Sequence, residues 1–320
     1  MSHHLVRALL SLSLAIVVAV GSFGSFGSVG HSGEPTTVAT DFTAAPAFTA
    51  AATFLSATTS NSATAGASGD RTLVTSAQLK RRPFRGVVLV AVGERVVCTG
   101  FVVAPRKVVT AAHCLTRDAA RGDFRLRGDL PGAIQLYRGF SEIAGGTPFT
   151  ACSVSSAWAH PQFVRRKPRD TSYGSRAHDY AVLTTAEDCS YPWNAVMRMW
   201  VTSASDGEFP TGSKVKLGGY PADPRFADMT GLNLWRSQGE VKPTGDDTRL
   251  IDTTGFVAQG MSGGPIWATF GKDSPCGRAQ CVVGILTECA VNARGQCKLG
   301  DSLRRAVRIT TEVKQSIRKR

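Results

Sequence analysis

The sequence lacks membrane-spanning runs, close cysteine pairs and nucleic-acid-binding motifs, and each absence excludes a class of protein. Its longest apolar run, Ala8–Val20, is too short to cross a bilayer comfortably. No two cysteines form a C-x-x-C pair of the kind that structural zinc sites use, so no metal is expected. The 37 Lys and Arg outnumber the 24 Asp and Glu. Without a nucleic-acid motif, this excess predicts a soluble basic surface rather than a nucleic-acid partner.

The N-terminal part of the chain lacks cysteine and nearly all basic residues. No Lys or Arg occurs between Arg7 and Arg71, and no cysteine precedes Cys98. The short basic start followed by the apolar run is typical of a signal peptide, which we assign to residues 1–30. Residues 31–72 are mainly Ala, Thr, Ser and Gly, a composition that cannot form a packed core. This segment is predicted to be a linker or propeptide, and the mature protein is predicted to be secreted.

The eight cysteines all lie in the remaining part of the chain. An even number of cysteines in an exported protein predicts disulfides, although the sequence alone does not give their pairing. A basic cluster at Lys80–Arg82, with Arg85 close by, is a plausible processing site for a propeptide. The alternative interpretation is that these residues are solvated surface.

Short β-branched runs separated by turn residues dominate the chain after residue 73, and they predict an all-β protein of barrels or sandwiches. Only Thr310–Ile317 shows helical spacing, with Val313 and Ile317 four residues apart on one face. The predicted strands are Gly86–Val92, Val96–Ala104, Lys107–Thr110, Ser213–Tyr220, Gly263–Phe270 and Cys281–Glu288.

One glycine-rich stretch, Gly260–Trp267, has the features of a nucleophile site. Ser262 lies between glycines that allow a tight turn, an exposed hydroxyl and backbone N–H groups directed at a substrate oxygen. The same spacing also fits the nucleophile elbow of α/β-hydrolases and glycine-rich turns without chemistry.

Chain order decides between the hydrolase families. His113 follows a predicted strand in Thr-Ala-Ala-His-Cys, and Asp179 precedes an apolar run. A histidine can accept the serine proton near neutral pH, and a buried carboxylate can orient it. No histidine follows Ser262, so the α/β-hydrolase order of serine before histidine is excluded.

The motifs Thr110–Cys114, His178–Leu183 and Gly260–Pro265, in this order, resemble those of trypsin-fold serine endopeptidases. Gly219–Pro221 and Leu234–Val241 are similar to the secreted glutamyl endopeptidase branch. The resemblance implies a peptidase domain over 73–320, with six-stranded antiparallel barrels over roughly 73–190 and 191–306, then a C-terminal helix. It also implies a catalytic triad of His113, Asp179 and Ser262, with an oxyanion hole formed by the N–H groups of Gly260 and Ser262. A disulfide is expected between Cys98 and Cys114, and Cys152–Cys189 is a further guess.

At the positions expected to bind substrate, the residues differ from those that set the known specificities of the family. Leu286 stands where the glutamyl branch has a histidine, and Phe256 stands where trypsin has an acidic pocket base. Met261 replaces the aspartate that pairs with the new N-terminus in animal digestive members, so that mode of activation is not expected. His160 is interpreted as part of a surface turn, and both it and His178 are expected to lie outside the chemistry. The predicted substrate-binding set is Phe256, Gln259, Leu286, Thr287 and Glu288, with Glu288 expected to be a solvated charge at the pocket rim.

The resemblance therefore predicts a secreted, monomeric serine endopeptidase that acts on proteins or peptides by acyl transfer, without a metal or organic cofactor. The alternative function is that of an inactive trypsin-fold protein that binds acidic glycans or cell-surface partners through its basic surface.

Overall fold

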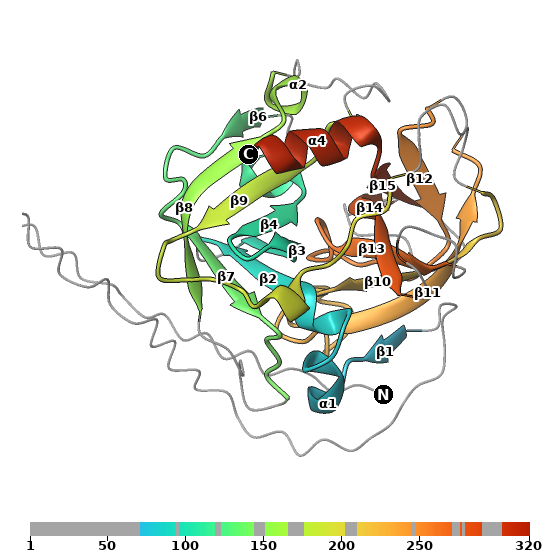
Figure 1. Ribbon diagram of the computed structural model, residues 1–320. Helices are drawn as coiled ribbons and strands as arrows, with labels where there is room; N and C mark the ends of the chain where they lie inside the picture. Colours follow the sequence, from blue (N-terminus) through green and yellow to red (C-terminus); the bar gives the residue numbers. More distant parts are fainter. Residues whose placement is uncertain are drawn as a thin grey trace, which may run out of the picture. The chain divides into compact units, whose positions relative to one another are not determined.

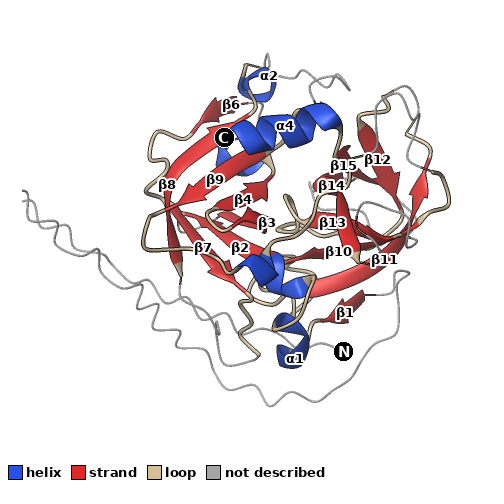
Figure 2. Ribbon diagram, viewed as in Figure 1, coloured by secondary structure: helices blue, strands red, loops and turns tan. Residues whose placement is uncertain are grey.

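The computed structural model describes residues 71–93, 96–118, 123–143, 151–165, 176–201, 210–244, 247–270, 276, 279–289 and 303–320. The predicted signal peptide and most of the predicted linker lie outside the described residues. Figures 1 and 2 show that strands dominate the described chain. Within it, no helix has the length and apolar character needed to cross a membrane.

Six antiparallel strands form a closed first barrel, in the order β2-β3-β4-β9-β8-β7. Its interior is filled mainly by β-branched and aliphatic side chains such as Val90, Val102 and Leu136, which pack well on a pleated surface. The strands are β2 (Val87–Val92), β3 (Val96–Ala104), β4 (Lys107–Thr110), β7 (Ile134–Arg138), β8 (Cys152–Ala159) and β9 (Ala181–Thr185).

The second barrel also contains six antiparallel strands. A sheet runs β11-β10-β13-β14-β15-β12, and pairing of β11 with β12 closes it. The strands are β10 (Lys214–Gly219), β11 (Trp235–Lys242), β12 (Leu250–Thr253), β13 (Pro265–Thr269), β14 (Gln280–Cys289) and β15 (Arg304–Arg308). The two barrels and the C-terminal helix confirm the predicted fold class.

The segment that precedes the first barrel joins the second one. Strand β1 (Arg71–Leu73) pairs with β11 of the second barrel, and the first strand of the first barrel begins only at Val87. Val74 and Leu79 are buried in a cluster that also holds side chains of both barrels. The basic cluster Lys80–Arg82 follows at once, and the Arg82 guanidinium donates hydrogen bonds to the carbonyls of Trp193 and Asn194. These contacts anchor Arg82, whereas Lys80 and Arg81 are exposed.

The helices are short apart from the last one. Helix α4 (Thr311–Lys319) buries Val313 and Ile317, the two residues that the helical spacing singled out. The other helices escape sequence analysis because three or four residues cannot display a helical period. They are α1 (Ser76–Leu79), α2 (Pro161–Val164) and the 3-10 turns η1 (Phe84–Gly86), η2 (Ala112–Leu115) and η4 (Trp193–Ala195). A small hairpin of β5 (Thr116–Asp118) and β6 (Asp123–Leu126) completes the described elements.

Candidate active site

Neighbouring strands of the first barrel bring His113 and Asp179 together. Strand β4 pairs with β9 so that Thr110 lies opposite Ala181. His113 follows the end of β4 on η2, and Asp179 lies two residues before the start of β9. Because the strands are antiparallel, the segment after β4 and the segment before β9 lie at the same end of the barrel. The pairing of β4 with β9 therefore accounts for a contact between residues far apart in the sequence.

Both carboxylate oxygens of Asp179 bind His113. The ring Nδ1 lies 2.7 Å from Oδ2, and the backbone N–H donates to Oδ1 over 2.9 Å. A carboxylate only accepts hydrogen bonds, so Nδ1 carries the proton in this pair, and a neutral ring keeps its lone pair on Nε2. The Asp179 side chain is 5% exposed and that of His113 is 24% exposed. The carboxylate is thus buried, and the imidazole reaches solvent.

The Ser262 turn is fixed by its backbone. Gly260 and Gly263 have φ values of +88° and +82°, which L side chains rarely adopt. The Gly263 amide donates to the Leu286 carbonyl over 2.7 Å, and the Leu286 amide donates to the Gly264 carbonyl over 2.9 Å. The Met261 side chain, next to Ser262 in the turn, is fully buried. The turn is therefore tied to β14 on one side and anchored in the core on the other.

Thr99, on β3 of the first barrel, joins this turn to the other half of the site. Its N–H donates to the Ser262 carbonyl over 2.8 Å, and its hydroxyl donates to the Gly260 carbonyl over 2.9 Å. The same hydroxyl accepts the N–H of Tyr220 over 3.0 Å. Thr99 is completely buried. Sequence analysis missed this residue, and its only signal was a hydroxyl within an apolar strand, next to a cysteine.

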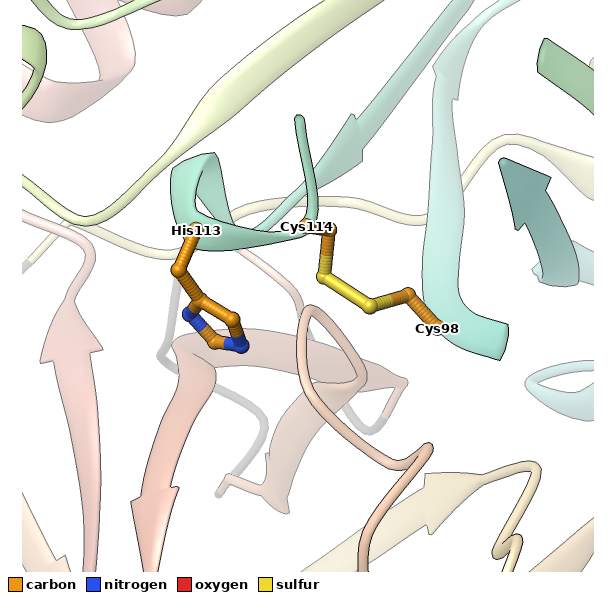
Figure 3. A group of neighbouring side chains, drawn as sticks. All are labelled: Cys98, His113 and Cys114. Carbon is orange, nitrogen blue, oxygen red and sulfur yellow. A yellow bond between two sulfur atoms is a disulfide. The ribbon is translucent and has the colours of Figure 1, made fainter. Parts of the chain in front are cut away.

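The predicted disulfide between Cys98 and Cys114 is present beside the His113 ring. A ring nitrogen of His113 and the two sulfur atoms lie within 4.8 Å of one another, and Figure 3 shows the ring and the disulfide extending from the same short turn. The sulfurs are bonded to each other, so neither is available as a thiolate ligand for a metal. Cys114 Sγ also contacts the Ser262 carbonyl at 4.0 Å. The disulfide thus lies against both the histidine and the serine turn.

The amides proposed for the oxyanion hole are available to a ligand. Among the described residues, none accepts a hydrogen bond from the N–H of Gly260 or of Ser262. The intervening Met261 amide is occupied, since it donates to the Ala258 carbonyl over 3.2 Å. Two donors on one tight turn can stabilise a developing oxyanion.

A cavity of about 110 Å³ opens beside Ser262. Four of the five predicted substrate-binding residues line it, namely Gln259, Leu286, Thr287 and Glu288. The other lining residues are Val257, Ala258, Ser262 and Cys289. Phe256 is not among the lining residues. Its buried ring instead packs edge-on against Phe226, beneath the guanidinium of Arg71.

Glu288 is not the solvated rim charge that the sequence suggested. Its side chain is 34% exposed and lies 3.5 Å from the Arg176 guanidinium. Burial raises the pKa of this carboxyl, and the Asp179 charge adds to the rise, while Arg176, Arg305 and His113 oppose it. The wall of the cavity therefore carries a carboxyl whose ionisation is costly.

His160 and His178 pack against each other. His160 is half-buried at the N-cap of α2 rather than on a surface turn. Its ring stacks on His178 with centroids 4.4 Å apart. Burial, together with the neighbouring His178, lowers the pKa of His160 to about 4. This ring is therefore neutral at physiological pH.

Two further disulfides occur among the described residues. Cys152 joins Cys189, as guessed from the sequence, and Cys276 joins Cys281. Cys289 is also disulfide-bonded, and no free cysteine occurs among the described residues. Cys297 lies outside the described residues.

Comparison with known proteins identifies the same kind of domain. The profile of the trypsin-like peptidase domain matches residues 98–272. A glutamyl endopeptidase from Bacillus licheniformis is 25% identical over 250 residues, which cover 77% of this chain and 65% of that protein. The human transmembrane protease serine 5 is 26% identical over 193 residues, covering 55% of this chain and 38% of its own. The chain thus spans less than two thirds of either curated relative.

A solved structure of a Glu endopeptidase in complex with MPD is similar in fold. It aligns with a TM-score of 0.56 and 19% sequence identity, covering 79% of this chain and 96% of that one. At this level of identity the alignment supports the two-barrel fold and leaves the residues of the site to be judged on their own geometry.

Proposed function

Because the chain belongs to the trypsin-like peptidase family, we propose that it is a secreted serine endopeptidase in which His113, Asp179 and Ser262 form the catalytic triad. The observation that carries this proposal is the pair of hydrogen bonds, 2.7 and 2.9 Å long, from His113 to the buried Asp179 carboxylate. An imidazole held in this way presents Nε2 as a base. The Ser262 turn and the His113 ring both lie against the Cys98–Cys114 disulfide.

The proposed reaction is acyl transfer. His113 takes the proton of the Ser262 hydroxyl as Ser262 attacks the scissile carbonyl, and then returns the proton to the leaving amine. Asp179 keeps the imidazole oriented and stabilises its protonated form. The amides of Gly260 and Ser262 stabilise the tetrahedral oxyanion, and loss of one such donor costs about 3 kcal/mol of transition-state stabilisation. Water then hydrolyses the acyl-enzyme.

The cavity beside Ser262 is proposed to hold the side chain on the acyl side of the cleaved bond. Val257, Ala258 and Leu286 give it an apolar lining, and Glu288 adds a carboxyl. The burial that makes ionisation of Glu288 costly would also penalise the charge of a substrate glutamate placed beside it. We therefore expect a small apolar residue to be preferred over glutamate. Profiling of cleavage sites on a peptide library measures this preference.

Secretion is supported by the disulfides. Three of them are present among the described residues, and disulfides persist in oxidising compartments. The apolar run near the N-terminus fits the export signal that this location requires. Detection of a processed chain in the culture medium, with its N-terminus sequenced, tests the proposal.

Labelling with a fluorophosphonate tests the catalytic proposal directly. Wild-type protein should be labelled on Ser262, whereas Ser262→Ala and His113→Ala should not be labelled. Ser155→Ala is the matched control, because that hydroxyl bonds to strand carbonyls away from the turn. Peptide hydrolysis by Ser262→Ala should fall by about 10⁵- to 10⁶-fold.

A wild-type protein that remains unlabelled after removal of residues 1–70 contradicts the proposal. That result would favour the alternative, a trypsin-fold binding protein without turnover. Labelling that persists in Ser262→Ala would place the reactive group elsewhere.

A further inference from the structure

Three potential metal ligands gather outside the His113–Asp179 pair. They are His160, at the N-cap of α2, His178, just before β9, and Glu312, in the first turn of α4. One ligand atom of each lies within 4.8 Å of the others. Figure 1 shows α2 and α4 close to β8 and β9 of the first barrel. Three segments distant in sequence thus direct nitrogen and oxygen donors at one point.

The surroundings of the cluster hold the two imidazoles in place. The His160 and His178 rings are stacked at 4.4 Å with an interplanar angle of 19°. Trp158 packs edge-on against His160 at 5.8 Å, and Tyr180 lies 5.1 Å from the same ring. His178 is 8% exposed, whereas Glu312 is exposed. The site therefore has an aromatic floor and a carboxylate on its solvent side, which leaves an entry path for an ion.

We propose that His160, His178 and Glu312 form a binding site for a zinc ion. Neutral imidazoles and a carboxylate suit Zn²⁺, whereas Ca²⁺ and Mg²⁺ prefer oxygen donors alone. Solvent supplies the fourth position on the exposed side. The site is independent of the proposed peptidase reaction, which needs no metal.

Zinc binding requires a modest contraction of the cluster. Zinc–ligand bonds of about 2.0–2.2 Å in tetrahedral geometry put the donor atoms about 3.3–3.5 Å apart. The exposed Glu312 side chain is free to approach, and the stacked rings must turn so that their lone pairs converge. Among the described residues, the His160 ring receives one hydrogen bond, from the Gln162 amide at 3.3 Å. This bond is long, so it opposes rotation of the ring only weakly.

An ion at this position would connect the segment that carries Asp179 to α4. His178 immediately precedes Asp179, and its carbonyl accepts the Tyr180 amide over 2.8 Å. Because zinc binds the folded arrangement and not the unfolded chain, its addition should raise the thermal unfolding temperature. This readout does not depend on catalysis.

Isothermal titration of the chelator-treated full-length protein with ZnCl₂ tests the proposal. We expect one zinc ion per chain, a raised unfolding temperature and no corresponding response to CaCl₂. Titration with CoCl₂ should produce the visible absorption bands of tetrahedral cobalt. Removal of a residue that hydrogen-bonds to a zinc ligand typically weakens zinc binding by about 10- to 100-fold. Removal of a ligand itself, in Glu312→Gln or His160→Gln, should therefore weaken zinc binding at least tenfold.

Matched variants separate this site from the other histidines. Glu187→Gln removes a carboxylate that is 94% exposed, and His113→Ala removes the other histidine among the described residues. Both should bind zinc as wild type does. Absence of binding to wild type overturns the proposal. Binding that is unchanged in Glu312→Gln and His160→Gln also overturns it, because the ion would then be held elsewhere, as by His3, His4 or His31.

Discussion

In the first barrel, His113 and Asp179 are held by side-chain hydrogen bonds that all end on one carboxylate. In the second barrel, the Ser262 turn is held by backbone bonds to β14 and by two glycines with positive φ. The two halves therefore meet the same requirement, fixed geometry at a proposed reacting group, through different parts of the chain. The first depends on which side chains are present, and the second depends on where side chains are absent.

This difference determines how each half should fail. Changing the carboxylate removes an electrostatic and orienting partner and leaves the barrel strands in place. Adding a side chain to the serine turn forces backbone atoms apart, which alters folding and activity together. Thr99 belongs to both halves, because its strand is in the first barrel and its partners Gly260, Ser262 and Tyr220 are in the second.

Asp179→Asn breaks the first-barrel half and should have the largest effect on catalysis. An asparagine cannot hold the tautomer that leaves Nε2 free, so kcat should fall by about 10⁴-fold with little change in the unfolding temperature. Peptide hydrolysis and thermal unfolding measure the two quantities. Asp123→Asn, at a surface carboxylate paired with Arg125, is the control and should keep full activity. A loss below tenfold in Asp179→Asn would show that the pair does not orient the catalytic base.

Gly263→Ala breaks the second-barrel half through the backbone. A Cβ there would lie 2.2 Å from the Thr99 carbonyl oxygen and 2.7 Å from the Ala111 nitrogen, at a φ of +82°. We expect a loss of about 3 kcal/mol or more in the free energy of unfolding, measured by urea denaturation. Gly128→Ala, with no atom within 4 Å of the added Cβ, should remain close to wild type. Equal stability of the two variants would mean that the turn is not constrained as described.

Thr99→Val separates the link between the halves from either half alone. The substitution keeps the shape of the side chain and leaves the Tyr220 amide and the Gly260 carbonyl without their hydroxyl partner. A buried donor and acceptor left unpaired should cost about 2 kcal/mol in the free energy of unfolding. Activity should fall as well, because the serine turn loses a support. Thr99→Ser retains the hydroxyl and should recover most of both losses, whereas equal behaviour of Val and Ser would assign Thr99 to packing alone.

The same contrast explains what the sequence could predict. His113 and Asp179 are recognisable from residue type and chain order, and the strands at Val96–Ala104 and Lys107–Thr110 have the predicted bounds. Thr99 escaped prediction because its importance comes from pairing between barrels, which no local pattern records. The pairing of β1 with β11 is nonlocal in the same way.

The packing around the cavity was predicted less well than the strands, for a physical reason. Alignment with family motifs gives the place of a residue along a strand but not the packing beneath it. Phe256 was expected at the pocket base, yet its ring is buried against Phe226 and does not line the cavity. Glu288 was expected to be solvated, and desolvation instead raises its pKa. The cluster of His160, His178 and Glu312 likewise depends on α4 returning to the first barrel.

Glu288→Gln should have the smallest effect on stability. It also tests the comparison of the two halves, because Glu288 lies in the second barrel and its pKa depends on the charge of Asp179 next to the first barrel. The pKa of Glu288 is raised above its ordinary value of 4.5, mainly by burial and further by Asp179. A carboxyl with a raised folded-state pKa favours the fold while protonated, and this contribution is lost as pH rises through the folded-state value. Wild type should therefore lose stability relative to Glu288→Gln as pH rises above the ordinary carboxyl value of 4.5, as measured by urea denaturation. Glu240→Gln provides the opposite sign, because Lys214 and Lys242 lower the pKa of Glu240, so wild type should lose stability relative to this variant as pH falls. If the Glu288→Gln difference persists unchanged in an Asp179→Asn background, the two barrels do not communicate through these charges.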